Sequence, residues 1–290
     1  MADIKVTGKL IPIPGGQANI FRLKTPSVNE KAVRGLARRL GMQADARSGA
    51  LRSDAEKLTY SEGFLELTMD RASGGIRFID RARWQVDDRE SDLKIEDAAA
   101  SRLAKNFVNK YKLAPSAETK FLKAARLHVG EATEGGKEAS DRVIDVAVAL
   151  QRLVGKIPVD GPGGKIIVYL NHERQTTGVE RIWRDIAGVH RRGGSYRTPQ
   201  DALGDMAEHF KAKQGVIEVQ EMRFGYFEDG WGSKQQYLQP AYVVFGMLTS
   251  PDSRIRKRTI YVAPALSNAV GRITPPLERQ APQRARTAKS

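Results

Sequence analysis

The sequence predicts an α+β fold made of tandem units, each with one helix packed on a small antiparallel sheet, and with an internal duplication. Two stretches, residues 97–183 and 198–265, each begin with a helix-like segment and continue through strand-like segments. Apolar residues recur every three to four positions in the helix-like segments and alternate in the strand-like ones. With the N-terminal region, these patterns divide the chain into four parts: residues 1–90, 91–190, 196–266 and 267–290.

The first ninety residues are expected to form a helix against a small sheet. Residues 19–23 alternate as a half-buried strand does, and residues 26–40 place their apolar side chains on one helical face. Gly41 then ends the helix. The Gly74-Gly75 pair between two alternating runs predicts a β-hairpin over residues 64–80.

The second unit, residues 91–190, begins with a helix near Asp97. Leu103, Phe107 and Tyr111 lie four residues apart, which places them on one helical face that can cover a sheet. Val, Ile and Ala predominate in the segments that follow, as they do in strands. The predicted strands are residues 126–129, 142–152, 165–170 and 179–186.

The third unit, residues 196–266, opens with the strongest helix signal in the chain. Thr198 is a good N-cap, Pro199 suits the first turn, and Asp201 stands three residues after the cap. Three strands are expected to follow, at residues 219–227, 237–248 and 259–263. The order of helix and strands matches the second unit, and this match is the basis of the predicted duplication.

Composition limits the classes of protein that the chain can belong to. It has 290 residues, 40% of them hydrophobic, which is enough for a substantial core. It has no cysteine, no run of the roughly 18 apolar residues that a membrane-spanning helix needs, and no N-terminal secretory pattern. We therefore expect a cytoplasmic protein. Part of its net charge of +14 lies in residues 267–290, whose proline and arginine content predicts a disordered basic tail.

Two regions of the sequence resemble the PepSY-like group, which includes the propeptide segments of secreted metallopeptidases and many stand-alone regulatory domains. The resemblance covers about half of the chain in two copies. The residues that carry it are Asp97-Ala98, Gly155–Val159 and Gly163–Val168 in the first copy, and Asp201-Ala202 and Gln239–Val244 in the second. It implies a non-catalytic module that binds, inhibits or helps to fold a peptidase, or that regulates another protein.

Motifs for catalysis or for a cofactor are absent from the sequence. The DGPGGK segment at residues 160–165 lacks the Gly-Lys-Ser/Thr ending of a phosphate-binding loop, so a hairpin turn is expected there. None of the four histidines belongs to a helix-borne metal-binding pair, and residues 193–196 are not a nucleophile elbow. We therefore expect no enzyme activity, no metal and no cofactor.

A polar loop that carries a tryptophan is the strongest binding candidate. An exposed tryptophan is a common anchor in protein recognition, although a tryptophan folded back over its own sheet is the simpler alternative. A cluster of basic residues near the C-terminus offers a second surface. The predicted binding residues are Glu228, Asp229, Trp231, Tyr237, Arg254, Arg256, Lys257 and Arg258.

The leading hypothesis is a non-enzymatic module that modulates, inhibits or chaperones a partner protein, which could be a peptidase. A nucleic-acid-binding protein is one alternative, because the segment 254–258 and the tail are rich in arginine. A structural subunit of a larger assembly is another. An enzyme would need residues that converge from separate segments, for which the sequence offers no motif.

Overall fold

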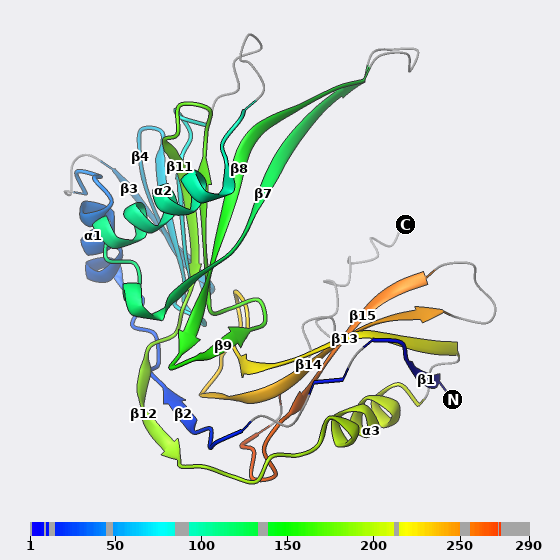
Figure 1. The fold of residues 1–290 in the computed structure, drawn as a ribbon. Coiled ribbons are helices and arrows are strands. Elements are labelled where there is room, and N and C mark those ends of the chain that lie inside the picture. The colour runs from blue at the N-terminus through cyan, green and yellow to red at the C-terminus, as the bar shows by residue number, and fades with distance from the viewer. Residues whose placement is uncertain are drawn as a thin grey trace, which may run out of the picture. The chain divides into compact units, whose positions relative to one another are not determined.

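The structure is a computed structural model that describes residues 2–8, 10–11, 15–44, 49–84, 93–132, 139–211, 215–249, 256–271 and 273. Within this part of the chain, strands take up 48% of the residues and helices 16%. The chain divides into two compact units (Figure 1). The large unit comprises residues 23–186 and 228–236, and the small unit comprises residues 1–22, 187–227 and 237–290.

Eight strands of the large unit form one antiparallel sheet. Its order is β7, β8, β10, β11, β6, β5, β4, β3. The bounds are β3 Ala50–Ser53, β4 Lys57–Glu62, β5 Leu65–Asp70, β6 Ile76–Asp80, β7 Thr119–Ala132, β8 Ala139–Val154, β10 Lys165–Leu170 and β11 Thr176–Ile182. A short strand, β9 (Ile157–Asp160), pairs with the end of β8.

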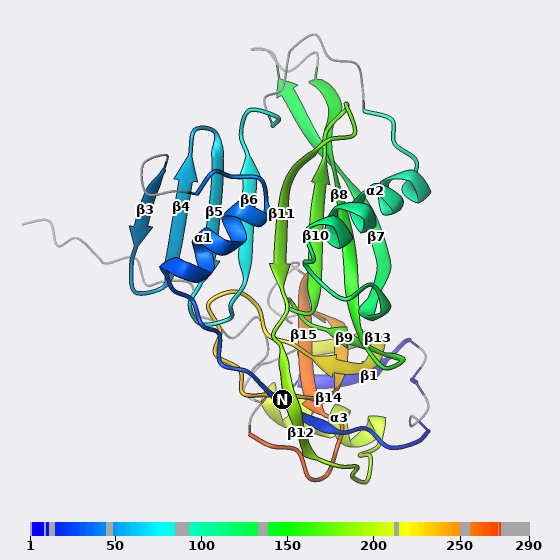
Figure 2. The ribbon, with the colours of Figure 1, turned by 90° about the vertical axis from the view of Figure 1, so that its left-hand side faces the viewer.

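Two helices lie on one face of this sheet (Figure 2). Helix α1 (Glu30–Arg39) begins at Asn29, whose side chain accepts a hydrogen bond from the Ala32 amide, and α2 (Asp97–Lys110) is followed by a short 3₁₀ helix, η1 (Ser116–Glu118). Apolar side chains from both helices and from alternate strand positions form one core, including Val33, Ala104 and Val148. The opposite face of the sheet carries no helix of the large unit in the described part of the chain.

The predicted tandem α+β units and their internal duplication are wrong. Strand β6 comes from the predicted first unit and β11 from the predicted second, yet the two pair directly, with Phe78 opposite Val179. Helices α1 and α2 therefore cover one wide sheet instead of two small ones. Such a pairing between strands about a hundred residues apart leaves no trace in the local patterns on which the prediction depended, and the molecule is mostly β.

The small unit contains the remaining strands and one helix. Strands β13 (Gly215–Phe227), β14 (Tyr237–Thr249) and β15 (Arg256–Pro264) are antiparallel, and β1 (Ala2–Val6) runs parallel to β13. The start of β14 also pairs with β2 (Ile20–Leu23), beside which lies β12 (Ile186–Arg191).

The helix of the small unit, α3 (Pro199–His209), confirms the predicted helix start. Thr198 and Asp201 form a reciprocal capping box, in which each side chain accepts a hydrogen bond from the other residue's backbone amide. Met206 and Phe210 pack against Tyr242 and other apolar residues of the sheet.

No helix in the described segments is long and apolar enough to cross a membrane.

Candidate binding site on the helix-free face

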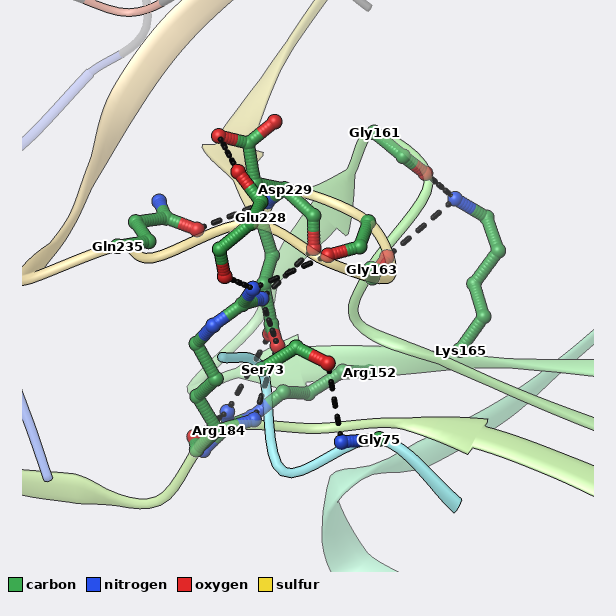
Figure 3. A network of polar contacts seen from close by, with 12 residues as sticks. Ser73, Gly75, Arg152, Gly161, Gly163, Lys165, Arg184, Glu228, Asp229 and Gln235 are labelled. Carbon is green, nitrogen blue, oxygen red and sulfur yellow. Dashed lines mark hydrogen bonds and ion pairs between the residues drawn. The ribbon is translucent and has the colours of Figure 1, made fainter. Parts of the chain in front are cut away.

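The loop predicted to bind a partner, residues 228–232, lies in the segment 228–236 of the large unit, and its first residue is fully buried. Glu228 is 0% exposed. Its Oε1 accepts a hydrogen bond from the Arg184 amide at 2.8 Å and lies 3.3 Å from Nη1 of the same arginine. Its Oε2 lies 3.7 Å from Nη1 of Arg152 (Figure 3). Glu228 therefore compensates two buried arginines instead of facing a partner.

Arg184 holds the loop in place through several carbonyl groups. Its guanidinium donates to the backbone oxygens of Asp229 at 2.7 Å, Gly230 at 3.2 Å and Ser233 at 2.7 Å (Figure 3). Burial raises the pKa of Glu228 and lowers the pKa of Arg184, and the charge of each residue opposes the shift of the other. This network fastens residues 228–236 to the sheet of the large unit.

The other two loop residues predicted to bind are also engaged within the large unit. The amide of Asp229 donates to Gln235, and its carboxylate accepts a hydrogen bond from the Ser233 hydroxyl at 3.0 Å. Trp231 is half-buried and packs so closely on Gly75 that a β-carbon at that position would lie 3.0 Å from the indole ring. The tryptophan thus folds back over the β5–β6 hairpin.

The glycine-rich segment 160–165 connects β9 to β10, but each of these strands pairs with β8 and not with the other, so the turn is present and the predicted hairpin is wrong. Gly161 and Gly164 have positive φ angles of 102° and 64°, a conformation that favours glycine. The Lys165 ammonium donates to the carbonyl oxygen of Gly161. The Lys165 side chain thus stabilises the turn that precedes it in the sequence.

The remaining predicted binding residues lie in the small unit or outside the described residues. Tyr237 begins β14, and its ring lies 4.6 Å from the ring of His190. Arg256, Lys257 and Arg258 are exposed on β15, where Arg256 pairs with Glu218 at 2.6 Å. Arg254 lies outside the described residues, as does most of the predicted disordered tail.

A different feature of the large unit has the character of a binding site. The side chain of Asp145, on β8, points to the helix-free face because Val146 and Val148 point into the helix-covered core. Asp145 is 1% exposed. Its Oδ2 accepts a hydrogen bond from the Thr177 hydroxyl at 2.9 Å, whereas its buried Oδ1 has no hydrogen-bond partner among the described residues.

Asp145 lies at the wall of a cavity of about 240 Å³ on this face. Gly178 belongs to its lining and lies so close to β6 that a β-carbon there would meet the Phe78 carbonyl oxygen at 2.9 Å. Trp84, at the rim, is 53% exposed. Its lining combines apolar and aromatic residues with four polar ones: Arg77, Phe78, Ile79, Trp84, Leu127, Asp145, Tyr169, Thr177, Gly178 and Glu180. We call this cavity the Asp145 pocket.

The Asp145 carboxyl group has an unusually high pKa for an aspartate. Burial raises its pKa from 3.8 to about 6, and the Thr177 hydroxyl and the Val146 backbone amide offset only part of that rise. At the rim, Arg77 and Glu180 neutralise each other at 2.8 Å. The pocket therefore combines apolar walls with one carboxylate oxygen that can accept a hydrogen bond or a positive charge.

Sequence reasoning missed Asp145, although a signal was present. An aspartate within a run of valine, isoleucine and alanine is unexpected in a buried strand. The small residues Ala147 and Ala149 share its strand face. In the described part of the chain, no three histidine, aspartate or glutamate side chains gather closely enough to hold a metal ion.

Comparison with known proteins shows similarity of fold alone. No family model and no curated protein matches the sequence. The crystal structure of an uncharacterized protein from Eubacterium rectale matches with a TM-score of 0.55 and 12% sequence identity, over 89% of this chain and 86% of the other. The PepSY-like resemblance stays a prediction.

Proposed function

We propose that this chain is a cytoplasmic, non-enzymatic module that binds a partner protein through the helix-free face of the large unit. The Asp145 pocket would receive a lysine or arginine side chain of that partner. The observation that carries the proposal is the buried Oδ1 of Asp145, which has no hydrogen-bond partner among the described residues. Such an atom destabilises the free protein by about 1–3 kcal/mol, so a cationic donor gains that free energy when it binds.

The size and lining of the pocket support a side chain as its occupant. Its volume of about 240 Å³ is below the roughly 300–1,000 Å³ of typical small-molecule sites. A lysine or arginine side chain has an apolar stem and a charged end. Leu127 and Trp84 would contact the stem, and Asp145 would accept the hydrogen bond.

The face of the sheet suits a partner better than its edge at β7 does. Strand β7 has β8 as its neighbour and shows two register shifts, one between Phe121 and Lys123 and one between Leu127 and His128. It also carries several positive charges, including Lys120 and Arg126. Irregular, lysine-rich edges are a known means of preventing strand addition.

Binding of blocked single amino acids tests the pocket directly. We expect Nα-acetyl-lysine methylamide, whose side-chain ammonium group is free, to shift the NMR signals of the Leu127 and Thr177 amides. The norleucine analogue, which has no charge, should shift them far less. Asp145→Asn should abolish the lysine-specific shift. Glu56→Gln removes the same charge from an exposed residue of the large unit and should leave the shift intact. Equal shifts for both ligands, or an unchanged shift in Asp145→Asn, would contradict the proposal.

Capture of proteins from a cell lysate then tests whether a partner protein binds through the Asp145 pocket. After nuclease treatment and cross-linking, we expect a protein retained by the wild type and by Glu56→Gln but lost with Asp145→Asn. If every retained protein disappears on nuclease treatment, the nucleic-acid alternative replaces the proposal. A protein retained equally by all three forms contradicts the role of the pocket.

A further inference from the structure

A second, polar cleft opens on the large unit where helix α2 ends. It has a volume of about 720 Å³. Its lining is Lys24, Asn109, Lys112, Leu113, Ala114, Pro115, Ser116, Glu118, Arg152, Arg181, Trp183, Asp185 and Ile186. We infer that this cleft, which we call the α2 cleft, binds a small molecule that carries a phosphate monoester group.

Arg181 is the centre of the argument. It lies opposite Ile166 and Ile76 in the sheet, so its side chain points to the helix-covered face. Its Nε is buried without a hydrogen-bond partner in the described part of the chain, and the largest favourable charge effect on the guanidinium comes from Asp185, which lines the same cleft. Burial lowers the pKa of Arg181. By contrast, the neighbouring Arg184 is compensated by Glu228 at 3.3 Å. A guanidinium with a buried, unbonded Nε is energetically unfavourable, and an anion that accepts a hydrogen bond from it lowers that free-energy cost.

The backbone at Lys112 gives a second, independent indication. Lys112 follows the last residues of α2 and has a φ angle of 50°, in the left-handed region that glycine or asparagine usually occupies at this position. A lysine held in this conformation reduces stability, and such residues cluster at functional sites. Here the conformation places the lysine at the wall of the α2 cleft.

Charge and shape define the ligand. Four cationic residues line the cleft, two more than the carboxylates Glu118 and Asp185, so the excess matches a dianion. A guanidinium presents paired donors that suit phosphate oxygens, and a lysine adds a point charge. The volume of the cleft falls within the range of small-molecule sites and exceeds what a free phosphate ion needs. Trp183 and Leu113 offer apolar contacts for the organic part.

Thermal unfolding and calorimetry test this site on the whole chain. At constant ionic strength and pH 7.5, we expect inorganic phosphate and glycerol 3-phosphate to raise the melting temperature above its value in chloride, with the ester binding more tightly. Malonate, a dianion of different shape, should have a smaller effect. Equal stabilisation by malonate, or none beyond that of chloride, would overturn the inference.

Substitution of Arg181 separates binding from folding. Arg181→Met should weaken phosphate binding at least about tenfold, the loss expected for one charged hydrogen bond. Its melting temperature without ligand should not fall, because the substitution removes a partly buried charge whose Nε has no hydrogen-bond partner in the described part of the chain. Arg102→Met removes the same charge from an exposed position on α2 and should bind as the wild type does. Unchanged phosphate affinity in Arg181→Met would overturn the assignment.

Lys112→Gly provides a test that does not depend on the folding of the Arg181 variant. Glycine relieves the left-handed conformation, so the melting temperature without ligand should rise by about 2 °C. The loss of the ammonium should weaken phosphate binding about fivefold. A variant that is more stable and binds phosphate as tightly as the wild type would contradict the role of Lys112.

Discussion

Two buried carboxyl groups of the large unit, Glu228 and Asp145, are almost equally hidden from solvent, and each has one oxygen without a hydrogen-bond partner in the described part of the chain, but they differ in the positive charges around them. Glu228 has two guanidinium groups and a backbone amide around it. Asp145 has one hydroxyl for one oxygen and no hydrogen-bond partner for the other. Burial therefore does not distinguish a structural carboxylate from a candidate binding residue. The number of donors that face the group does.

The surroundings of the two groups explain this difference. Glu228 fastens a loop to the sheet together with Arg184 and Arg152, and these two guanidinium groups compensate its charge, although its Oε2 accepts no hydrogen bond in the described part of the chain (Figure 3). Asp145 lies at the wall of a cavity, and no guanidinium or ammonium group pairs with it in the described part of the chain. A charge-compensated network rigidifies a fold, whereas a buried carboxylate without a counter-charge reduces stability.

The largest expected effect comes from removing the charge of Glu228. Glu228→Gln keeps the shape of the side chain but leaves Arg184 and Arg152 without their shared counter-charge. We expect a loss of about 3–5 kcal/mol in the free energy of unfolding, measured by urea denaturation at pH 7.5. The exposed control Glu56→Gln should change it by less than about 0.5 kcal/mol. Wild-type stability in Glu228→Gln would show that the network does not hold the loop.

The parts of the fold that were predicted from sequence are those encoded by neighbouring residues. The capping box at Thr198 and Asp201 and the hairpin around Gly74-Gly75 each depend on a few consecutive positions, and both predictions are confirmed. The arrangement of the sheet depends on pairs such as Ile79 and Gly178, which local patterns do not reveal. Long-range strand pairing is therefore where the prediction of tandem units failed.

The candidate site likewise combines features that neighbouring residues encode with features that depend on residues far apart in the sequence. An aspartate in an apolar strand is visible in the sequence, but the identity of its donor, Thr177, 32 residues further on, is not. Glu228 has the appearance of a loop residue in the sequence, and its burial depends on Arg184, which lies 44 residues earlier. Residue type can indicate that a group is unusual. Only the folded chain indicates whether it is paired.

A smaller effect, of opposite sign, is expected from removing the charge of Asp145. Asp145→Asn should stabilise the free protein relative to the wild type at pH 7.5, by on the order of 1–2 kcal/mol after allowance for solvent screening. The reason is that the wild type must keep an incompletely paired carboxylate in a buried position at that pH. Urea denaturation at pH 4 and at pH 7.5 measures the difference in the free energy of unfolding between Asp145→Asn and the wild type.

The pH dependence follows from the direction of the shift. The pKa of Asp145 is about 6 in the folded protein and 3.8 as the reference value, so the folded state binds the extra proton between these values. The free-energy cost of the buried carboxylate charge is therefore close to zero near pH 4. This cost grows as the pH rises toward 6 and is constant above pH 6. The stabilisation of Asp145→Asn should therefore be larger at pH 7.5 than at pH 4. Equal values at the two pH values would mean that Asp145 is as well paired as Glu228.

The smallest effect concerns the Thr177 hydroxyl, which with the Val146 backbone amide offsets part of the cost of burying the Asp145 carboxylate. Thr177→Val keeps the shape of the side chain and removes the hydrogen bond to Oδ2. We expect the pKa of Asp145, measured from its carboxyl carbon by NMR, to rise above about 6, with a loss of about 0.5–1.5 kcal/mol of stability at pH 7.5. Thr59→Val is the control, because Thr59 bonds the neutral Thr68 hydroxyl at 3.0 Å and its loss should be independent of pH. An unchanged Asp145 pKa in Thr177→Val would show that another donor already supports the carboxylate, and the contrast with Glu228 would then disappear.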